Sequence, residues 1–357
     1  MRKHQFNGEF ARRVEPEFKT FMDKAEKIRW SPKHIAFDKI DYSKLTMADL
    51  FAVFVTLHIE NYSDVYTKLL LKHYEDLPVM HGFLKNWERE EENHARTLEQ
   101  YLIAVGMPLD ELRANYAKVD KDDFPFPSEN QTGLNVFVFF QELLTREMYT
   151  KMLKSCREPV LVDILKRVVR DEERHYRFYK YTLGLRFELD KKDTLAQFRK
   201  IVRIFGMPQT MFRQKAMTDK LMEYFPYAVD EIMGIAKPIM KLLEAGPSKL
   251  LERFQNLQNV WINRRAFSYL LQSPYFWGHV GITLKTRAGL KAVSKKDAEY
   301  VQSVIDRLYG LLQKRLGEVA VHDRLAAVGA GAGDGLVAHG AKAVREGLHD
   351  GARRVHA

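Results

Sequence analysis

Two pairs of residues, each a glutamate followed three residues later by a histidine, could together bind metal ions. Glu91 precedes His94, and Glu172 precedes His175. Residues three apart on a helix lie on the same side about one turn apart, so each pair could contact one ion. Carboxylate oxygens with one imidazole per ion suit iron or manganese, and open coordination positions would admit dioxygen. One such pair alone would be weak support, because Glu-x-x-His also occurs on solvated helices.

Both pairs fall on apolar stripes. Apolar residues recur at alternating spacings of four and three before each pair, namely Met80, Leu84 and Trp87 before Glu91, and Leu161, Leu165 and Val168 before Glu172. This rhythm is typical of the buried face of a helix. The carboxylates and imidazoles therefore stand where a core is expected. A buried carboxylate is costly unless it is paired, protonated or bound to a metal.

Two further glutamates complete the pattern. Glu60 follows the apolar stripe Leu50, Val53 and Leu57, and Glu142 follows Val138. Glu91 comes 31 residues after Glu60, and Glu172 comes 30 residues after Glu142. Each half is thus a helix with one glutamate, a turn, and a helix with Glu-x-x-His, which is the ligand set of a di-iron four-helix bundle.

The doubled pattern predicts two metal positions. Glu60, Glu91 and His94 would surround one, Glu142, Glu172 and His175 the other, with Glu91 and Glu172 bridging. The alternative is that these acids are salt-bridge partners of Arg89, Arg170 or Arg174. Of the neighbouring acids, Asp171 could hold an imidazole N–H, whereas Glu88, Glu90, Glu92 and Glu173 are expected in solvent. His58, His73 and His81 lack the doubled context and are expected not to bind metal.

The elements that must position these residues are helices. Turn and cap signals predict four helices, over about 46–74, 78–105, 132–156 and 159–184, with a connection over 107–130 and a further helix over 193–205. The expected fold class is all-α, a ferritin-like four-helix bundle elaborated by more helices within 210–317. We expect residues 1–28 to form a polar surface helix, 29–317 the main domain, and 318–357 a flexible tail rich in Gly, Ala and His.

Composition limits the class of protein. Of 357 residues, 46% are hydrophobic and 29% charged, which is typical of a globular protein. No apolar run approaches the roughly 18 residues of a membrane span, and the start at Met1 shows no secretory signal. The single Cys156 excludes an internal disulfide framework and favours the cytoplasm. The net charge of +10 favours acidic partners, but no nucleic-acid-binding motif is present.

Several short motifs, in the same order along the chain, resemble those of one enzyme family. They are Trp30-Ser31-Pro32, Glu60 with Tyr66 six residues on, Trp87 four before Glu91, Glu91-Glu92-Asn93-His94, Phe140-Gln141-Glu142 with Thr145, Asp171-Glu172-Glu173-Arg174-His175, and Met207-Pro208. Over about residues 25–215 the chain resembles the soluble acyl-[acyl-carrier-protein] desaturases, the type 2 fatty acid desaturases. The match departs from the family at Asn61 and Asp64, where a second acid and a proline are usual, and at Asn93, one place later than usual.

The resemblance implies roles for particular residues. The six ligands would bind two irons, and Thr145 would lie beside the oxygen site and help to protonate bound oxygen. Trp30 and Asp171 would lie near His94 on an electron route to the surface, with Trp87 nearby; core packing is the alternative for Trp87. Leu69 and Leu70 could line the acyl channel, although they too could serve packing. Two lysines and a histidine within residues 67–73 leave the channel length open.

The function that follows is an O2-dependent desaturase that forms a cis double bond in an acyl chain on acyl carrier protein. Its electrons would come from a ferredoxin-type donor, since no Gly-x-Gly-x-x-Gly fingerprint for a flavin or nicotinamide is present. The family also implies a homodimer. The alternatives are another di-iron oxygenase, such as an N-oxygenase or hydrocarbon-forming oxidase, a ferritin-like iron-binding protein, or a homologue that has lost its metal.

Overall fold

The computed structural model describes residues 3–116, 130–204, 215–225, 231 and 295–330. Every regular element among these residues is a helix. None of the described helices combines the length and the apolar character that crossing a membrane requires. Met207-Pro208 and most of the helices expected within 210–317 lie outside the described residues.

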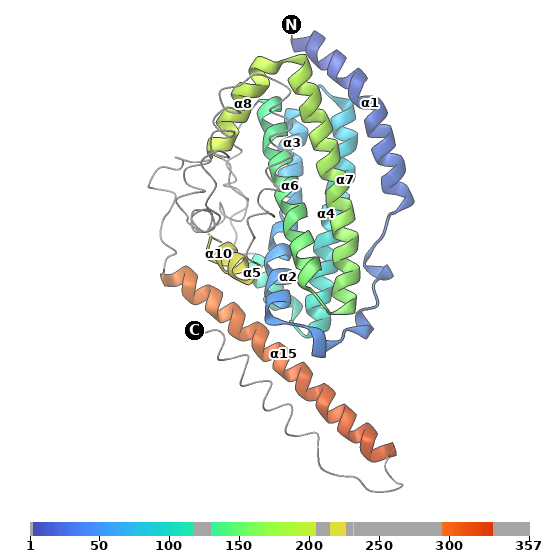
Figure 1. Cartoon of the computed structure of the whole chain (residues 1–357), viewed down its shortest axis with the longest axis vertical. Helices are drawn as coiled ribbons and strands as arrows, with labels where there is room; N and C mark the ends of the chain where they lie inside the picture. Colours follow the sequence, from blue (N-terminus) through green and yellow to red (C-terminus); the bar gives the residue numbers. More distant parts are fainter. Residues whose placement is uncertain (1–2, 117–129, 205–214, 226–230, 232–294, 331–357) are drawn as a thin grey trace, which may run out of the picture. The chain divides into compact units, whose positions relative to one another are not determined.

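Five helices form the bundle that carries the predicted ligands: α2 (Met47–Glu60), α3 (Ser63–His73), α4 (Pro78–Val105), α6 (Gln131–Ser155) and α7 (Pro159–Leu189). The α2–α3 pair packs against α4, α6 packs against α7, and α4 contacts α7 (Figure 1). Because α2 and α3 follow one another and together occupy one of the four helix positions, the five helices make a four-helix bundle. This is the ferritin-like bundle predicted from the doubled pattern, and the predicted all-α fold class is confirmed.

The helix ends follow local cap chemistry. Thr46 caps α2, since its hydroxyl accepts the Asp49 N–H at 3.1 Å and the Asp49 carboxylate accepts the Thr46 N–H in return. The second bundle helix, α4, ends at Gly106, whose φ of 112° is the left-handed conformation that favours glycine. Asn130 caps α6 through the Thr132 and Gly133 N–H groups.

The predicted helix over 46–74 is wrong in one respect, because the chain breaks it after Glu60. The Tyr62 N–H donates to the Ile59 carbonyl three residues back, at 3.1 Å, and α3 starts afresh at Ser63. The apolar rhythm carries on through the buried Tyr66 and Leu70, so periodicity alone predicted a continuous helix. The break lies directly after a predicted metal ligand.

The first helix, α1 (Lys3–Lys27), packs against α4 and α7. Its buried residues Phe10, Val14, Phe21 and Ala25 join the hydrophobic core. The helix expected to lie on the surface therefore buries one face. The segment that follows makes three short 3-10 turns, over Pro32–His34, Phe37–Lys39 and Tyr42–Lys44.

Four more helices are described: α5 (Leu109–Tyr116), α8 (Lys191–Ile204), α10 (Lys215–Tyr224) and α15 (Lys295–Ala330). Within the connection expected over 107–130, α5 is helical, and α8 corresponds to the helix expected over 193–205. The last bundle helix, α7, runs past the expected stop at Gly184 to Leu189. The described residues divide into two units, one that ends at Leu312 and one that begins at Gln313. The division of the chain at residues 28 and 317 stays a prediction.

Candidate metal centre

The bundle brings all six predicted ligands together in its interior. Glu60 is the last residue of α2, and Glu142 lies in the middle of α6; α4 contributes Glu91 and His94, and α7 contributes Glu172 and His175. All six side chains are buried, and both imidazoles have no exposed surface.

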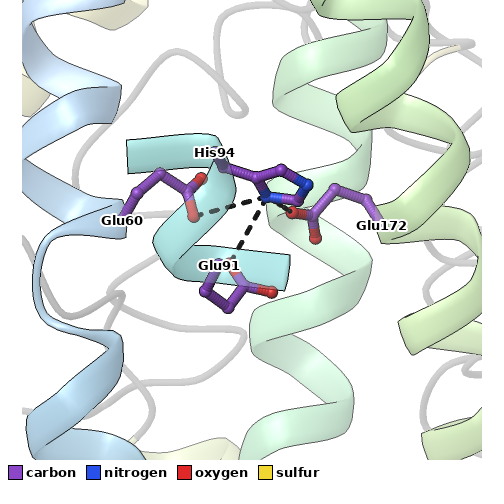
Figure 2. Close-up of side chains that lie close together, drawn as sticks. All are labelled: Glu60, Glu91, His94 and Glu172. Atoms are coloured by element: carbon purple, nitrogen blue, oxygen red, sulfur yellow. Dashed lines mark ion pairs between the residues drawn. The ribbon is translucent and has the colours of Figure 1, made fainter. Parts of the chain in front are cut away.

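The ligand atoms form two overlapping groups. One comprises Glu60, Glu91, His94 and Glu172, and the other comprises Glu91, Glu142, Glu172 and His175; within each group the atoms lie within 4.8 Å of one another. Figure 2 shows the first group, with the carboxylates of three helices turned towards the His94 ring. Glu91 and Glu172 belong to both groups, as bridging carboxylates between two metals would.

Both imidazoles turn the same ring nitrogen towards the carboxylates. His94 Nδ1 lies 3.4 Å from Glu172 and 3.7 Å from Glu91. His175 Nδ1 lies 3.0 Å from Glu91 and 3.5 Å from Glu142. In each ring the other nitrogen, Nε2, faces an acid outside the cluster, which assigns the Nε2–H tautomer to the metal-binding form and leaves Nδ1 for a metal.

The donor set fits metal ions because its atoms are otherwise unsatisfied. The buried atoms without a hydrogen bond include five that face one another in this cluster: Glu91 Oε1, His94 Nδ1, Glu142 Oε2, Glu172 Oε1 and His175 Nδ1. Native proteins rarely leave so many buried polar atoms unpaired in one place. Two cations would satisfy them all at once.

The alternative interpretation, that arginines pair with the six ligands, is wrong. Arg89 pairs with Asn86 and Glu26. Arg170 donates to the Ile28 carbonyl and lies 3.9 Å from Asp171. Arg174 pairs with Asp171 and Glu90, as described below. None of the three forms an ion pair with a predicted ligand among the described residues.

Without metal, protons must balance the buried charge. Burial, together with the neighbouring charge of Glu91, raises the pKa of Glu60 to about 8. Burial also raises the pKa of Glu142 and Glu172. Burial would lower the pKa of His94, but Asp171 and the negative charge of the cluster carboxylates raise it well above its usual range. Metal binding would therefore release protons from this site.

A cavity adjoins the carboxylates. It is lined by Ile59, Glu60, Ser63, Tyr66, Trp87, Glu91, Gln141, Glu142, Thr145 and Glu172. Thr145 follows Glu142 by three residues on α6, and the two side chains line the same cavity. The structure thus places a buried hydroxyl beside the cluster. Trp87 lines this cavity as well. A place for Trp87 on the electron route stays a prediction.

Asp171, which accepts a hydrogen bond from Trp30, contacts His94 at Nε2, the ring nitrogen that faces away from the cluster carboxylates. Trp30 Nε1 donates to Asp171 Oδ2 at 2.6 Å, and that oxygen lies 3.3 Å from His94 Nε2. The Trp30 ring stacks on the His94 ring with centroids 6.0 Å apart. These contacts supply a connected path from Trp30 to the cluster, and an electron-transfer role for that path stays a prediction.

Leu69 and Leu70 do not line the described cavity. Leu70 is fully buried, and Leu69 is half-buried against the hydrophobic core. Their positions favour packing, and contact with an acyl chain stays a prediction. His58 and His81, expected not to bind metal, contact backbone carbonyls, of Phe54 at 2.7 Å and Leu71 at 3.0 Å.

Three residues near the cluster had no site role in the sequence analysis. The fully buried Tyr149 donates a short hydrogen bond from its hydroxyl to Glu60. Arg174, which the sequence suggests only as an ion-pair partner of the ligands, donates to Asp171 and Glu90 instead. Glu90, expected in solvent, has a side chain only 12% exposed and contacts both His175 and Arg174. The expectation for Glu90 is therefore wrong, because α7 covers it.

A protein-family model and a curated relative, both described as desaturases, match this chain. The model of the type 2 family described as "Fatty acid desaturase" matches residues 74–238. The desaturase DesA1 of two Mycobacterium tuberculosis strains, provisionally named an acyl-[acyl-carrier-protein] desaturase, is 26% identical over 147 residues. That match covers 38% of this chain and spans only 44% of the length of these relatives.

Solved structures give a weaker likeness. The acyl-ACP desaturase-like protein DesA2 of Mycobacterium tuberculosis H37Rv is 17% identical with a TM-score of 0.49, covering 68% of this chain and 98% of that one. A mutant R2-like ligand-binding oxidase with a Mn/Fe cofactor is 18% identical with a TM-score of 0.41, covering 64% and 90%. Likeness at this level carries no functional inference. The resemblance predicted from the sequence motifs is confirmed by the family model.

Proposed function

From the relation of this chain to the type 2 fatty acid desaturases, we propose that it is an O2-dependent di-iron desaturase. It forms a cis double bond in an acyl chain presented by acyl carrier protein. The observation that carries the proposal is the pair of buried, overlapping carboxylate–imidazole groups, whose unpaired atoms face one another. In a chain that matches the desaturase family model, such a donor set supports a metal centre that activates oxygen.

An oxygen-activating metal suits this reaction because a saturated acyl chain has no acidic proton. Acid–base catalysis by side chains therefore cannot remove its hydrogens. Two irons held by Glu60, Glu91, His94, Glu142, Glu172 and His175 would supply the oxidising chemistry when bound. The protein supplies the placement of the substrate and of the protons.

The residues of the cavity have separate tasks in this proposal. The Thr145 hydroxyl donates a proton at the oxygen site, from the wall next to Glu142. Other residues of the wall, among them Tyr66, Trp87 and Gln141, hold the reacting part of the acyl chain and exclude water. Leu69 and Leu70 are proposed to act farther along the acyl chain.

The desaturation reaction and the positive net charge of the chain indicate which proteins it would bind. Electrons come from an external donor of the ferredoxin type, through Trp30, Asp171 and His94. Ferredoxins and acyl carrier proteins are typically acidic, which suits a chain of net charge +10. A homodimer and a cytoplasmic location belong to the same proposal.

Metal analysis and product analysis test the function together. Purified protein reconstituted with ferrous iron should hold about two irons per chain. After reduction, acyl carrier protein substrate and O2 should give an alkene by mass spectrometry. A hydroxylated, N-oxidised or shortened product would instead identify a different di-iron oxygenase. Bound iron with no substrate consumed would favour iron binding as the function, and absence of bound iron would contradict the proposal.

A further inference from the structure

The two Glu-x-x-His helices share a third acidic position. Each helix carries an acid directly before the glutamate of its pair: Glu90 before Glu91 in α4, and Asp171 before Glu172 in α7. The doubled motif is therefore acid-Glu-x-x-His. An acid directly before the inward-facing glutamate lies about 100° away around the helix, towards the flank. On the flank, it can contact a neighbouring helix.

Each of these acids contacts the histidine of the opposite helix. Glu90 Oε2 lies 2.7 Å from His175 Nε2, and Asp171 Oδ2 lies 3.3 Å from His94 Nε2. The contacts are reciprocal: α4 orients the imidazole of α7, and α7 orients the imidazole of α4. In both rings Nδ1 is left facing the cluster carboxylates.

Arg174 joins the two acids. Its Nη2 donates to Glu90 Oε1 at 2.6 Å, and its Nη1 donates to Asp171 Oδ1 at 2.8 Å. The guanidinium side chain is 9% exposed, so water screens these contacts little. Asp171 also accepts the Trp30 indole N–H, so one chain of contacts runs from Trp30 through Asp171, Arg174 and Glu90 to His175.

We infer that Glu90 and Arg174 are positioning residues of the metal centre: Glu90 fixes the His175 ring for its metal, as Asp171 fixes His94, and Arg174 couples the two acids. This inference rests on the proposed function, since it assigns residues that act through the two histidine ligands. Loss of such an outer partner typically weakens metal binding by about 10–100-fold.

The reciprocal contacts predict which iron each acid affects. Glu90→Gln keeps the size of the side chain but loses its charge, and it should perturb the iron beside His175. Asp171→Asn should perturb the iron beside His94. Arg174→Ala should perturb both, because it contacts both acids. Glu92→Gln is the matched control: it is two residues from Glu90 on the same helix, its side chain is 42% exposed, and it pairs with Arg96.

Mössbauer spectra of protein reconstituted with iron-57 resolve the two irons. The expected result is that Glu90→Gln and Asp171→Asn change different signals, Arg174→Ala changes both, and Glu92→Gln changes neither. Iron release to a chelator should be faster by about 10-fold or more in the first three variants. Glu90 and Asp171 variants that change the same signal, or a Glu90 variant that behaves like wild type, would overturn the inference.

A measurement on metal-free protein separates this inference from the proposed function. With nitrogen-15 labelled histidine, the His175 Nε2–H should give a low-field proton resonance that is protected from exchange. That resonance should move or disappear in Glu90→Gln and persist in Glu92→Gln. If the wild-type chain binds no iron, the proposed function fails, while the proton resonance still tests the contact between Glu90 and His175. A His175 resonance unaffected by Glu90→Gln would contradict the positioning role.

Discussion

Glu142 and His175 meet inside the bundle with ligand atoms that form no hydrogen bond, Oε2 and Nδ1, 3.5 Å apart. We expect Glu142→Ala or His175→Ala to reduce bound iron from about two per chain to one or fewer, because each change removes a ligand that no other described side chain replaces. Metal analysis after reconstitution measures this. Glu173→Gln should keep full iron content, since Glu173 points to Arg146 and Arg177; a similar loss there would contradict the ligand assignment.

The Thr145 hydroxyl is the second residue-scale test. Thr145→Val keeps the shape of the side chain and removes the proton donor, so product formation should fall by about 100-fold or more while iron content stays unchanged. O2 uptake without an equal amount of alkene would show that O2 consumption is uncoupled from desaturation in this variant. Thr145→Ser should restore most of the product. An active Thr145→Val variant would leave Thr145 with a packing role only.

The ligands could be predicted from sequence because each continues an apolar stripe that is set within its own helix. Glu90 could not be predicted in the same way. Its burial depends on α7, which supplies Arg174 and His175 from more than 80 residues away. The available signal was the doubled acid before each Glu-x-x-His. The sequence predicts Asp171 as a residue that holds a histidine, and Glu90 occupies the equivalent place in α4.

At the scale of elements, Glu158 ties the start of α7 to its neighbours. Its fully buried carboxylate accepts hydrogen bonds from Asp41 N, the Tyr101 hydroxyl, Val160 N and Leu161 N, at 2.7–3.1 Å. Glu158→Ala would leave several of these donors unsatisfied at about 1–3 kcal/mol each. We expect the free energy of unfolding to fall by more than about 3 kcal/mol.

Urea denaturation of the metal-free protein measures that change, so that loss of iron does not enter the comparison. Asp163→Ala, in the next turn of α7, is the matched control: its side chain is 46% exposed and, within the described part of the chain, it pairs only with Arg167 in the same helix. Such an exposed pair contributes less than about 1 kcal/mol. Equal losses for Glu158 and Asp163 would show that the buried network adds nothing.

The break between α2 and α3 shows where sequence patterns stop being informative. The apolar stripe favours continuation through Asn61 and Tyr62, and neither position is a glycine or proline. The turn there depends on how the two helices pack on α4, which is tertiary information. Glu60 and Ser63, on either side of the break, line the cavity at the metal centre and also a second cavity at the surface of α4.

For the whole molecule, the all-α class and the bundle followed from the internal repeat, which sets the number of helices and their order. The repeat does not determine how α1 docks. Its charged sequence predicted a surface helix, yet Phe21 lies 4.9 Å from Phe83 and 5.5 Å from Phe178, ring centroid to centroid. Four apolar residues spaced over 16 positions are enough to bury one side of an otherwise polar helix.

The last prediction concerns stability as a function of pH, and it belongs to the whole molecule because the centre joins four helix positions. In metal-free protein the folded-state pKa of Glu60, about 8, lies above the 4.5 of an ordinary glutamate. Between those values the unfolded chain loses a proton that the folded chain keeps, so stability falls as pH rises. His94 and His175, with raised pKa values, add to the loss above about pH 6.5.

Metal-free protein should therefore unfold at lower urea concentration at about pH 8 than at about pH 5. Glu91 and Asp171 have lowered pKa values and act in the opposite sense, but only in acid, as pH falls below their unfolded values near 4. Glu60→Gln keeps a hydrogen-bond acceptor for Tyr149 but cannot titrate, so the stability of this variant should fall less steeply with rising pH. Iron competes with protons for the same atoms, so its stabilising effect should grow over this range. Metal-free protein that became more stable from pH 5 to pH 8 would show that these carboxylates do not share one dry site.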